Sequence, residues 1–277
     1  MTGKFHKNWG EFGGFKHPDA LKYELASMLM YGAKCSVGDQ MHPLGFMDRE
    51  TYRMIGKAYA YVDEIKDYCY GLRETTTLAL VTGESERGNE GIQKILLENQ
   101  LDFDVIHTLD DISRYECLVI PEGVYLDEAA AKKLEAFIAT GGGILFCHDA
   151  CMDKGKTRFL IDAGVVYAGE SPFEMDYLKA GEALADNLVN VPFKCYSPAL
   201  RVAVRDATVL AEVYEPYFRR TVARFNGHIN APFHMEPSAY PGAVQKGNVV
   251  YLAHSIGTQY AEHGLRLARD YFVNALR

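Results

Sequence analysis

Gly3-Lys4-Phe5-His6-Lys7-Asn8-Trp9-Gly10-Glu11-Phe12-Gly13-Gly14 is the stretch that indicates the fold of the first part of the chain. After one predicted helix comes a second stretch of the same kind, Ala33-Lys34-Cys35-Ser36-Val37-Gly38-Asp39-Gln40-Met41-His42-Pro43. Each is a short apolar run that ends in clustered polar and aromatic residues. In a (β/α)8 barrel such clusters lie at the carboxyl ends of the strands and form the active site. About two of the eight strands fit before Thr77, so we expect a chain that begins inside a catalytic barrel.

The residues around these two strand ends predict helices. Leu21, Leu25, Met28 and Leu29 give residues 18–31 an apolar face, and Pro18 suits the first turn. A short strand is expected over 34–38. A second helix follows, capped by Asp48 or Thr51. The result is an αβα fragment of a (β/α)8 barrel, which cannot close a sheet by itself.

From Thr77 onward the pattern becomes that of a doubly wound α/β domain with parallel strands. Apolar runs predict buried strands at 77–82, 103–107, 117–120 and 143–147, separated by helices at about 88–99 and 127–139. Further along we expect a helix at about 155–163, strands at 201–204, 208–214, 220–225 and 249–253, and a final helix at about 260–276.

Composition limits the possible functions. The chain has 277 residues, is 48% hydrophobic and carries a net charge of −8, which argues against nucleic-acid binding. No apolar run is long enough for a membrane span and no secretory leader is visible, so we expect a cytoplasmic protein with no membrane partner. The six cysteines form no CxxC pair, so we expect reduced thiols, no metal site and no cofactor.

Two resemblances cover nearly the whole chain. Residues 77–277 resemble the class I glutamine-amidotransferase-like domain, in the flavodoxin-like form that follows the barrel of certain β-galactosidases and is called the trimerisation domain. Residues 3–71 resemble the last part of the barrel in a family of hypothetical glycoside hydrolases that carry this same second domain. The stretches that match the first are Thr77–Thr82, Cys117–Val124, Gly141–Leu145 and Gly247–Leu252; those that match the second are Phe5–Gly13 and Gly38–Pro43.

Glu11 and Asp39 are the first candidate site. Glycoside hydrolysis needs two carboxyl groups across the scissile bond, and residues after adjacent barrel strands can supply them. Trp9 would then be a platform for the apolar face of a sugar. His6, Gln40 and His42, together with Asp39, would bind hydroxyl groups. The alternative is structural: Asp39 and Gln40 only fix a loop, and Trp9 fills the junction between two domains.

Cys147 is the candidate nucleophile of a second, competing site. It ends a strand at the place where an amidotransferase holds its cysteine, and His254, or His234 with Glu236, would complete a triad. However, the expected Gly-x-Cys-x-Gly turn is absent from Phe146-Cys147-His148-Asp149, which favours a small buried residue. His148 and Asp149 are candidates for lining a ligand pocket at the carboxyl edge of the sheet.

Three other features of the sequence are weaker indications of function. Glu122, after a strand, is interpreted as a solvated carboxylate in a turn. The glycine-containing loop 83–91 carries three glutamates that would repel phosphate, so nucleotide binding is rejected. An aromatic series interleaved with arginines between Tyr214 and Tyr240 indicates a sugar-facing wall or a subunit interface, and we favour the interface.

Together these features predict part of a carbohydrate-active, glycoside hydrolase-like protein. Residues 1–72 would be an end-of-barrel fragment. Residues 73–277 would form an amidotransferase-like α/β domain that serves oligomerisation, with a trimer possible, and supports the sugar site. We expect this chain alone to be inactive. The alternatives are a cysteine-dependent amidohydrolase that uses Cys147 and His254, and a non-catalytic sugar-binding or scaffolding module.

Overall fold

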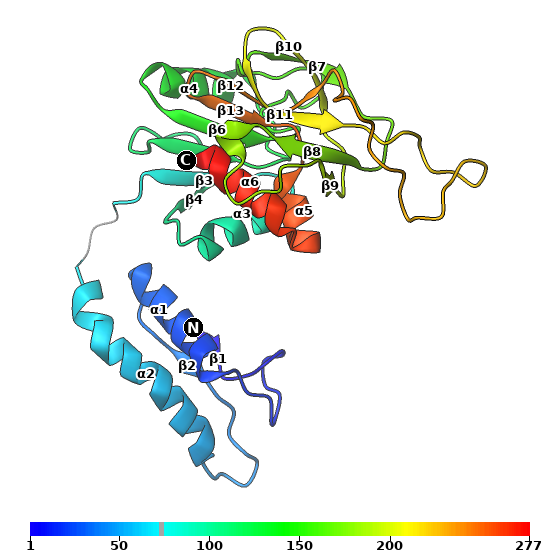
Figure 1. The fold of residues 1–277 in the computed structure, drawn as a ribbon. Helices are drawn as coiled ribbons and strands as arrows, with labels where there is room; N and C mark the ends of the chain where they lie inside the picture. Colours follow the sequence, from blue (N-terminus) through cyan, green and yellow to red (C-terminus); the bar gives the residue numbers. More distant parts are fainter. Residues whose placement is uncertain (72–74) are drawn as a thin grey trace. The chain divides into compact units, whose positions relative to one another are not determined.

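The computed structural model describes residues 1–71 and 75–277 (Figure 1). The chain forms two compact units, Met1–Thr75 and Thr76–Arg277. The predicted boundary between residues 72 and 73 lies outside the described residues.

The first unit runs β1 (Thr2–Gly3), α1 (Pro18–Met30), β2 (Val37–Gly38) and α2 (Arg49–Cys69). The two short strands are parallel, and Thr2 pairs with Val37. Asp48 is the N-cap of α2, where its side chain accepts hydrogen bonds from the Glu50 N–H at 3.0 Å and the Thr51 hydroxyl at 2.9 Å. The helices pack through a buried core of Leu21, Leu25, Leu29, Ile55, Ala58 and Val62.

The second unit is built on a mixed sheet (Figure 1), which within residues 75–277 has nine strands. Five parallel neighbours form one half of it, in the order β4, β3, β5, β6, β13. Antiparallel strands β12, β11, β8 and β9 extend the sheet beyond β13. The bounds are β3 Leu78–Val81, β4 Asp104–Ile106, β5 Cys117–Ile120, β6 Gly143–Cys147, β8 Asp176–Ala180, β9 Phe193–Cys195, β11 Thr208–Tyr214, β12 Pro241–Lys246 and β13 Val249–Leu252.

Layers cover both faces of this sheet, which explains why its parallel strands are continuous apolar runs. One face packs against α4 (Glu128–Ala139) and the antiparallel pair β7 (Val165–Gly169) and β10 (Arg201–Val204). The other face packs against α3 (Glu86–Glu98), α5 (Ile256–His263) and α6 (Arg266–Leu276), with the short 3-10 turn Glu182–Leu184 beside them. Alternate residues of a strand serve opposite layers, as Phe146 and Cys147 do.

Helices α3 and α5 cross at three glycines. A Cβ atom added to Gly91 would collide with the carbonyl group of Gly257, and one added to Gly257 would collide with the backbone of Gly88. Because glycine has no side chain, the two backbones approach until they touch. This crossing holds the amino ends of both helices close to the carboxyl edge of β5, where Glu122 lies.

Three predicted elements were wrong. Residues 155–163 form turns because Asp153 binds the Thr157 N–H and hydroxyl, and Lys156 has a positive φ of 54°. The segment 220–225 holds only the isolated pair Thr221 and Arg224 and lies in an excursion from the sheet. The final helix is divided at Gly264, whose left-handed φ of 58° ends α5 before α6 begins.

Candidate functional site

The indole of Trp9 lies against the two strand ends of the first unit. A Cβ atom at Gly3 would come within 2.8 Å of the indole, and one at Gly38 would collide with it. The ring also meets Phe5 edge-on, with 5.2 Å between centroids. Since glycines on both parallel strands leave room for the ring, Trp9 has a fixed place, yet 62% of the residue remains exposed. Such a ring suits the apolar face of a sugar.

Glu11 lies two residues after Trp9 and is fixed by the backbone of its own loop. Its Oε2 accepts hydrogen bonds from the Lys7 N–H at 3.0 Å and the Asn8 N–H at 3.2 Å. These two hydrogen bonds lower the pKa of Glu11, and the one from the Lys7 N–H has the larger effect. The carboxyl group is therefore ionised at neutral pH. It suits a nucleophile or a hydroxyl acceptor better than a general acid.

The other predicted residues of this unit lie on the same loops. The Asp39 carboxylate faces the buried Lys4 ammonium at 3.9 Å, which joins the ends of β2 and β1. With its amide turned to match its neighbours, Gln40 donates to the Gly10 carbonyl and accepts from the Phe12 N–H at 3.1 Å. Asp39 and Gln40 thus contact the loop that carries Trp9.

The two histidines of the first unit differ in their surroundings. His42 stacks on Phe46 at 4.3 Å between ring centroids, and its Nδ1 accepts from the Leu44 N–H at 3.2 Å. His6 is exposed. Phe12 and Met41, which are also exposed, extend the apolar surface of these loops. The loops therefore offer an aromatic platform, an ionised carboxylate and imidazole groups.

The geometry of Cys147 does not support the amidohydrolase alternative. Its side chain is fully buried in the layer formed by α3, α5 and α6, and burial raises the pKa of its thiol well above the usual value. The residue in the left-handed conformation that a nucleophile turn needs is His148, with φ of 52°. The strand therefore ends one residue too late for Cys147 to occupy that position.

His254 pairs with Asp176, and both are buried. The His254 Nε2 lies 2.7 Å from Asp176 Oδ1, and the other carboxylate oxygen of Asp176 accepts from the Ala199 N–H at 2.8 Å. Burial alone would lower the pKa of His254, but the Asp176 carboxylate raises it well above its usual value. Together with Cys195, these residues place three ligand atoms within 4.8 Å of one another, close enough to hold a metal ion. The positions of the three residues along the sequence did not reveal this group. The direct hydrogen bond makes His254 and Asp176 a buried pair that joins the ends of β13 and β8.

Asp149 fixes the loops after β5 and β6. It accepts hydrogen bonds from the Gly123 N–H at 3.0 Å, the Tyr125 hydroxyl at 2.7 Å and the Lys156 ammonium at 2.9 Å. Burial would raise the pKa of this carboxyl group, but hydrogen bonds from His148, Tyr125 and Lys156 outweigh burial and lower it far below its usual value. These internal partners engage both oxygens, so Asp149 positions a loop.

The interpretation of Glu122 as a solvated carboxylate was wrong, because only 4% of the residue is exposed. Its Oε1 accepts from the Thr258 N–H at 2.6 Å in the first turn of α5, and its Oε2 has no partner within the described residues. A negative charge at the amino end of a helix is favoured by the helix dipole. The glycine crossing of α3 and α5 leaves room for this side chain, and sequence spacing alone could not reveal that.

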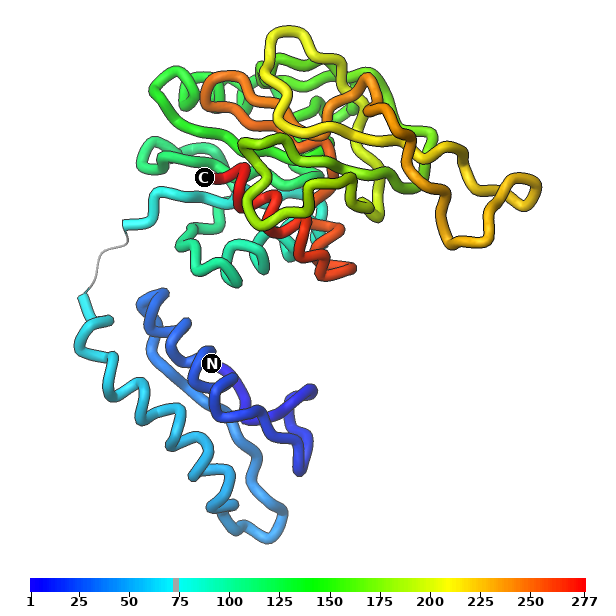
Figure 2. The backbone as a smooth tube through the Cα atoms, viewed as in Figure 1, coloured from blue at the N-terminus to red at the C-terminus, as the bar shows by residue number. Residues whose placement is uncertain are grey.

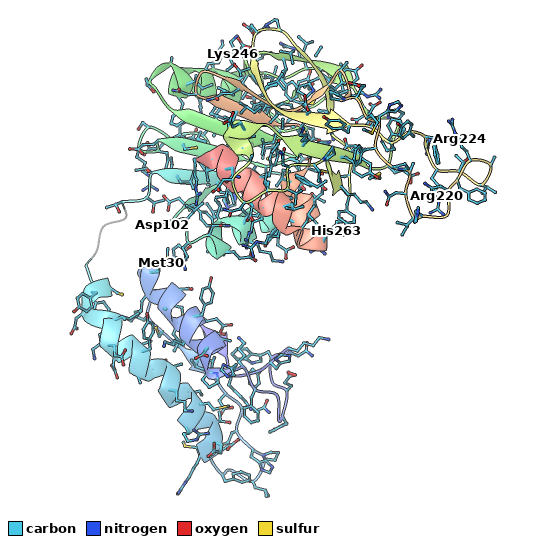
Figure 3. All side chains as sticks on the ribbon, viewed as in Figure 1. Met30, Asp102, Arg220, Arg224, Lys246 and His263 are labelled. Atoms are coloured by element: carbon cyan, nitrogen blue, oxygen red, sulfur yellow. The ribbon has the colours of Figure 1, made fainter. Side chains whose placement is uncertain are left out.

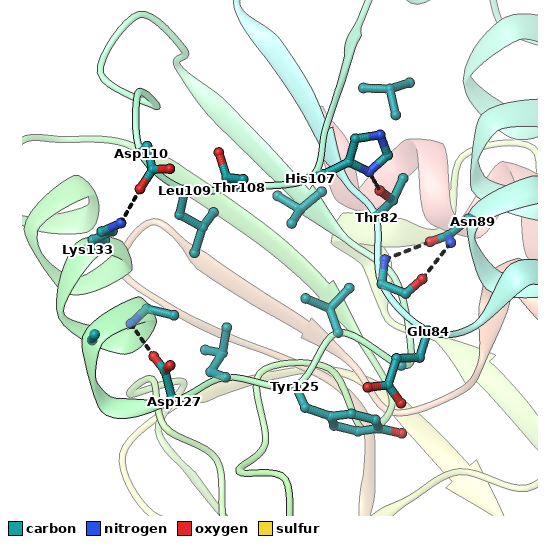
Figure 4. Close-up of a pocket in the computed structure, with 18 of the residues that line it drawn as sticks. Thr82, Glu84, Asn89, His107, Thr108, Leu109, Asp110, Tyr125, Asp127 and Lys133 are labelled. Carbon is teal, nitrogen blue, oxygen red and sulfur yellow. Dashed lines mark hydrogen bonds and ion pairs between the residues drawn. The ribbon is translucent and has the colours of Figure 1, made fainter.

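A groove of about 810 Å³ lies at the carboxyl ends of β3, β4 and β5 (Figure 4). On one side Thr82 Oγ1 is 2.5 Å from His107 Nδ1, and on the other Lys133 binds Asp110 at 2.6 Å. Tyr125 lines the groove and links it to Asp149, but His148 and Asp149 are not among its described lining residues. Sequence reasoning missed Thr82 and His107, although each follows an apolar strand.

None of the helices that the structure describes combines the length and the apolar character needed to cross a bilayer.

The sequence pattern of the β-galactosidase trimerisation domain matches residues 94–157. The structure is similar to α-L-fucosidase isoenzyme 2 from Paenibacillus thiaminolyticus, with a TM-score of 0.90 and 35% identity over 100% of this chain and 44% of that one. A search of the curated proteins gives no match.

Two β-galactosidases are similar in fold. The enzyme from Bacillus circulans sp. alkalophilus has a TM-score of 0.65 and 12% identity over 96% of this chain and 44% of its own. That from Rahnella sp. R3 has a TM-score of 0.65 and 13% identity over 96% and 42%. The chain thus spans less than half the length of these proteins. Residues 94–157 match a β-galactosidase trimerisation domain, and the chain is similar over its length to part of a glycoside hydrolase.

Proposed function

We propose that this chain is part of a carbohydrate-active glycoside hydrolase. In this proposal the first unit is a fragment of a (β/α)8 barrel that contributes a sugar-binding surface. The second unit serves oligomerisation and supports the sugar site without chemistry of its own. The whole protein would work in the cytoplasm, with no nucleic-acid or membrane partner.

The barrel part of the proposal is supported by the order of elements in the first unit. Strands β1 and β2 are parallel and joined through α1, as successive strands of a barrel are. Lys4 and Asp39, which directly follow the two strands, meet at one edge. The described residues of this unit form only a two-stranded sheet, so a closed barrel needs strands from elsewhere.

The amidotransferase-like part is supported by strand order. Numbered along the chain, the five parallel strands lie in the order 2-1-3-4-5, which is the order of flavodoxin-like folds. In such folds ligands bind where the strand order reverses, and the groove beside Thr82 and His107 lies there. The buried thiol of Cys147 favours a role without acyl transfer.

The observation that carries the proposal is the exposed indole of Trp9, which rests on Gly3 and Gly38 in the same loop as the ionised Glu11. The similar structures are an α-L-fucosidase and several β-galactosidases. L-Fucose and D-galactose differ in the hydroxyl groups they present but share an apolar face. We therefore infer that one of these two sugars binds to this face.

Trp9 is the only tryptophan of the sequence, so its fluorescence reports directly on this site. Titration of the full chain with L-fucose or D-galactose should change the emission of Trp9 saturably. Glu11→Gln removes the charge but keeps the size of the side chain, and it should weaken this binding. Gly38→Ala should displace the indole and abolish the change, because a Cβ atom there collides with the ring.

Gly56→Ala is the matched control, since Gly56 lies in α2 with open space around its Cα. This variant should bind sugar like the wild type. If neither sugar changes the emission of Trp9 at millimolar concentration, or if Gly38→Ala binds as well as Gly56→Ala, the sugar-binding role of this surface is refuted. With aryl glycosides, we expect this chain alone to show no turnover.

A further inference from the structure

An extended arm leaves the sheet of the second unit between β11 and β12 (Figures 1 and 2). Its two sides are joined at the base, where the Tyr217 N–H donates to the Pro232 carbonyl at 3.0 Å and the His234 N–H donates to the Glu215 carbonyl at 2.8 Å. We use the name arm for residues 216–231. Figure 3 shows Arg220 and Arg224 far out on it.

The outer part of the arm carries apolar side chains that its own unit leaves uncovered. Val222 is 98% exposed, Ile229 80% and Phe225 67%. The arm nevertheless has a defined shape, because Thr221 pairs with Arg224 and Arg220 donates to the Ile229 carbonyl at 2.8 Å. Exposed apolar side chains on a projection of defined shape are characteristic of a contact surface.

The charge of the arm indicates which surface it contacts. It contains three arginines and no acidic residue, a charge of +3, whereas the whole chain carries −8, so the rest of the chain carries −11. Arg219 lies near Glu174 at 3.6 Å, and Arg224 lies over the Phe218 ring at 5.2 Å. A basic arm on an otherwise acidic protein is complementary to a second copy of the same chain.

We propose that this arm is the contact by which one copy of the chain binds the acidic surface of the next copy. The proposal rests on the oligomerisation role proposed above and specifies the partner and the segment. In a ring of three copies each interface joins two different surfaces, so a projecting arm on one copy and an acidic surface on the next satisfy the symmetry.

The test uses light scattering of the full chain after size-exclusion chromatography. The wild type should be oligomeric at micromolar concentration. The variant Val222→Asp/Ile229→Asp should associate at least about thirtyfold more weakly, the effect of a single hot-spot residue. Val191→Asp is the matched control, because Val191 is a valine elsewhere in the unit that is 57% exposed, and it should leave association unchanged.

The outcomes separate the two proposals. If the wild type is oligomeric and the arm variant associates equally well, the arm proposal is overturned while the oligomerisation role stands. If the wild type is a monomer, both are overturned. Unchanged far-UV circular dichroism would establish that the arm variant is folded. High salt should weaken wild-type association, since the contact is expected to pair opposite charges, and insensitivity to salt would contradict this charge pairing.

Discussion

Gly91→Ala tests whether the crossing of α3 and α5 depends on glycine. A Cβ atom at position 91 would collide with the Gly257 carbonyl oxygen and lie 2.8 Å from the Gly257 Cα atom. Both helices must then separate, which disturbs the packing of Ile92, Ile95 and Ile256. Overpacking of this kind costs about 3 kcal/mol at the upper end of its usual range.

The same substitution has an opposing effect, because alanine favours a helix over glycine by about 1 kcal/mol. The net loss of unfolding free energy should therefore be about 2 kcal/mol. For a unit of this size that lowers the melting temperature by about 4–8 °C. Gly56→Ala, in the open part of α2, should instead gain about 0.5–1 kcal/mol.

Thermal melts followed by far-UV circular dichroism measure the first variant, because the second unit holds most of the regular structure. The emission of Trp9 reports on the first unit and should show the same transition in the wild type and in Gly91→Ala. A Gly91→Ala protein as stable as the wild type would refute the inferred contact between the two helix backbones.

Three further predictions concern the candidate residues. Cys147 should react slowly with iodoacetamide at neutral pH and quickly after unfolding, because burial raises the pKa of its thiol. Peptide mass spectrometry measures the reaction, and fast reaction in the native state would support the nucleophile hypothesis. His254→Ala should cost about 3–5 kcal/mol in urea unfolding, since it leaves Asp176 buried and unpaired, whereas His263→Ala, at a partly exposed position, should cost far less. Asp149 has a folded-state pKa below its unfolded value, so its stabilisation is present above about pH 4 and is lost as the pH falls. Asp149→Asn should therefore be less stable at pH 7 and lose less stability between pH 4 and pH 2, and an acid limb identical to that of the wild type would contradict this.

Local patterns in the sequence predicted the elements that they fully specify. The apolar runs at 117–120 and 143–147 are strands with those bounds, and Asp48 caps α2. Both are local properties, because burial on two faces requires a continuous apolar run and a cap needs only its own first turn. The match to a β-galactosidase trimerisation domain likewise agrees with the resemblance found in the sequence.

The irregular parts could not be predicted in this way. Strand β12 begins with Pro241 and Gly242, which are unfavourable in strands, and only its pairing with β11 and β13 makes it one. The helix predicted over 155–163 is absent because Asp153 binds the backbone of Thr157. In the first case neighbouring strands outweigh propensity, and in the second a side chain just before the predicted helix does.

In the candidate site, too, some features follow from the sequence and others only from the folded structure. The sequence by itself determined which chemical groups follow the strands, including Trp9, Glu11 and Asp39. The tertiary structure decided what each group can do: it placed Trp9 on two glycines, gave Glu11 two backbone donors, and buried Glu122, Cys147 and His254. The physical reason is that composition along a chain sets chemistry, whereas burial and charge pairing depend on residues that meet only after folding.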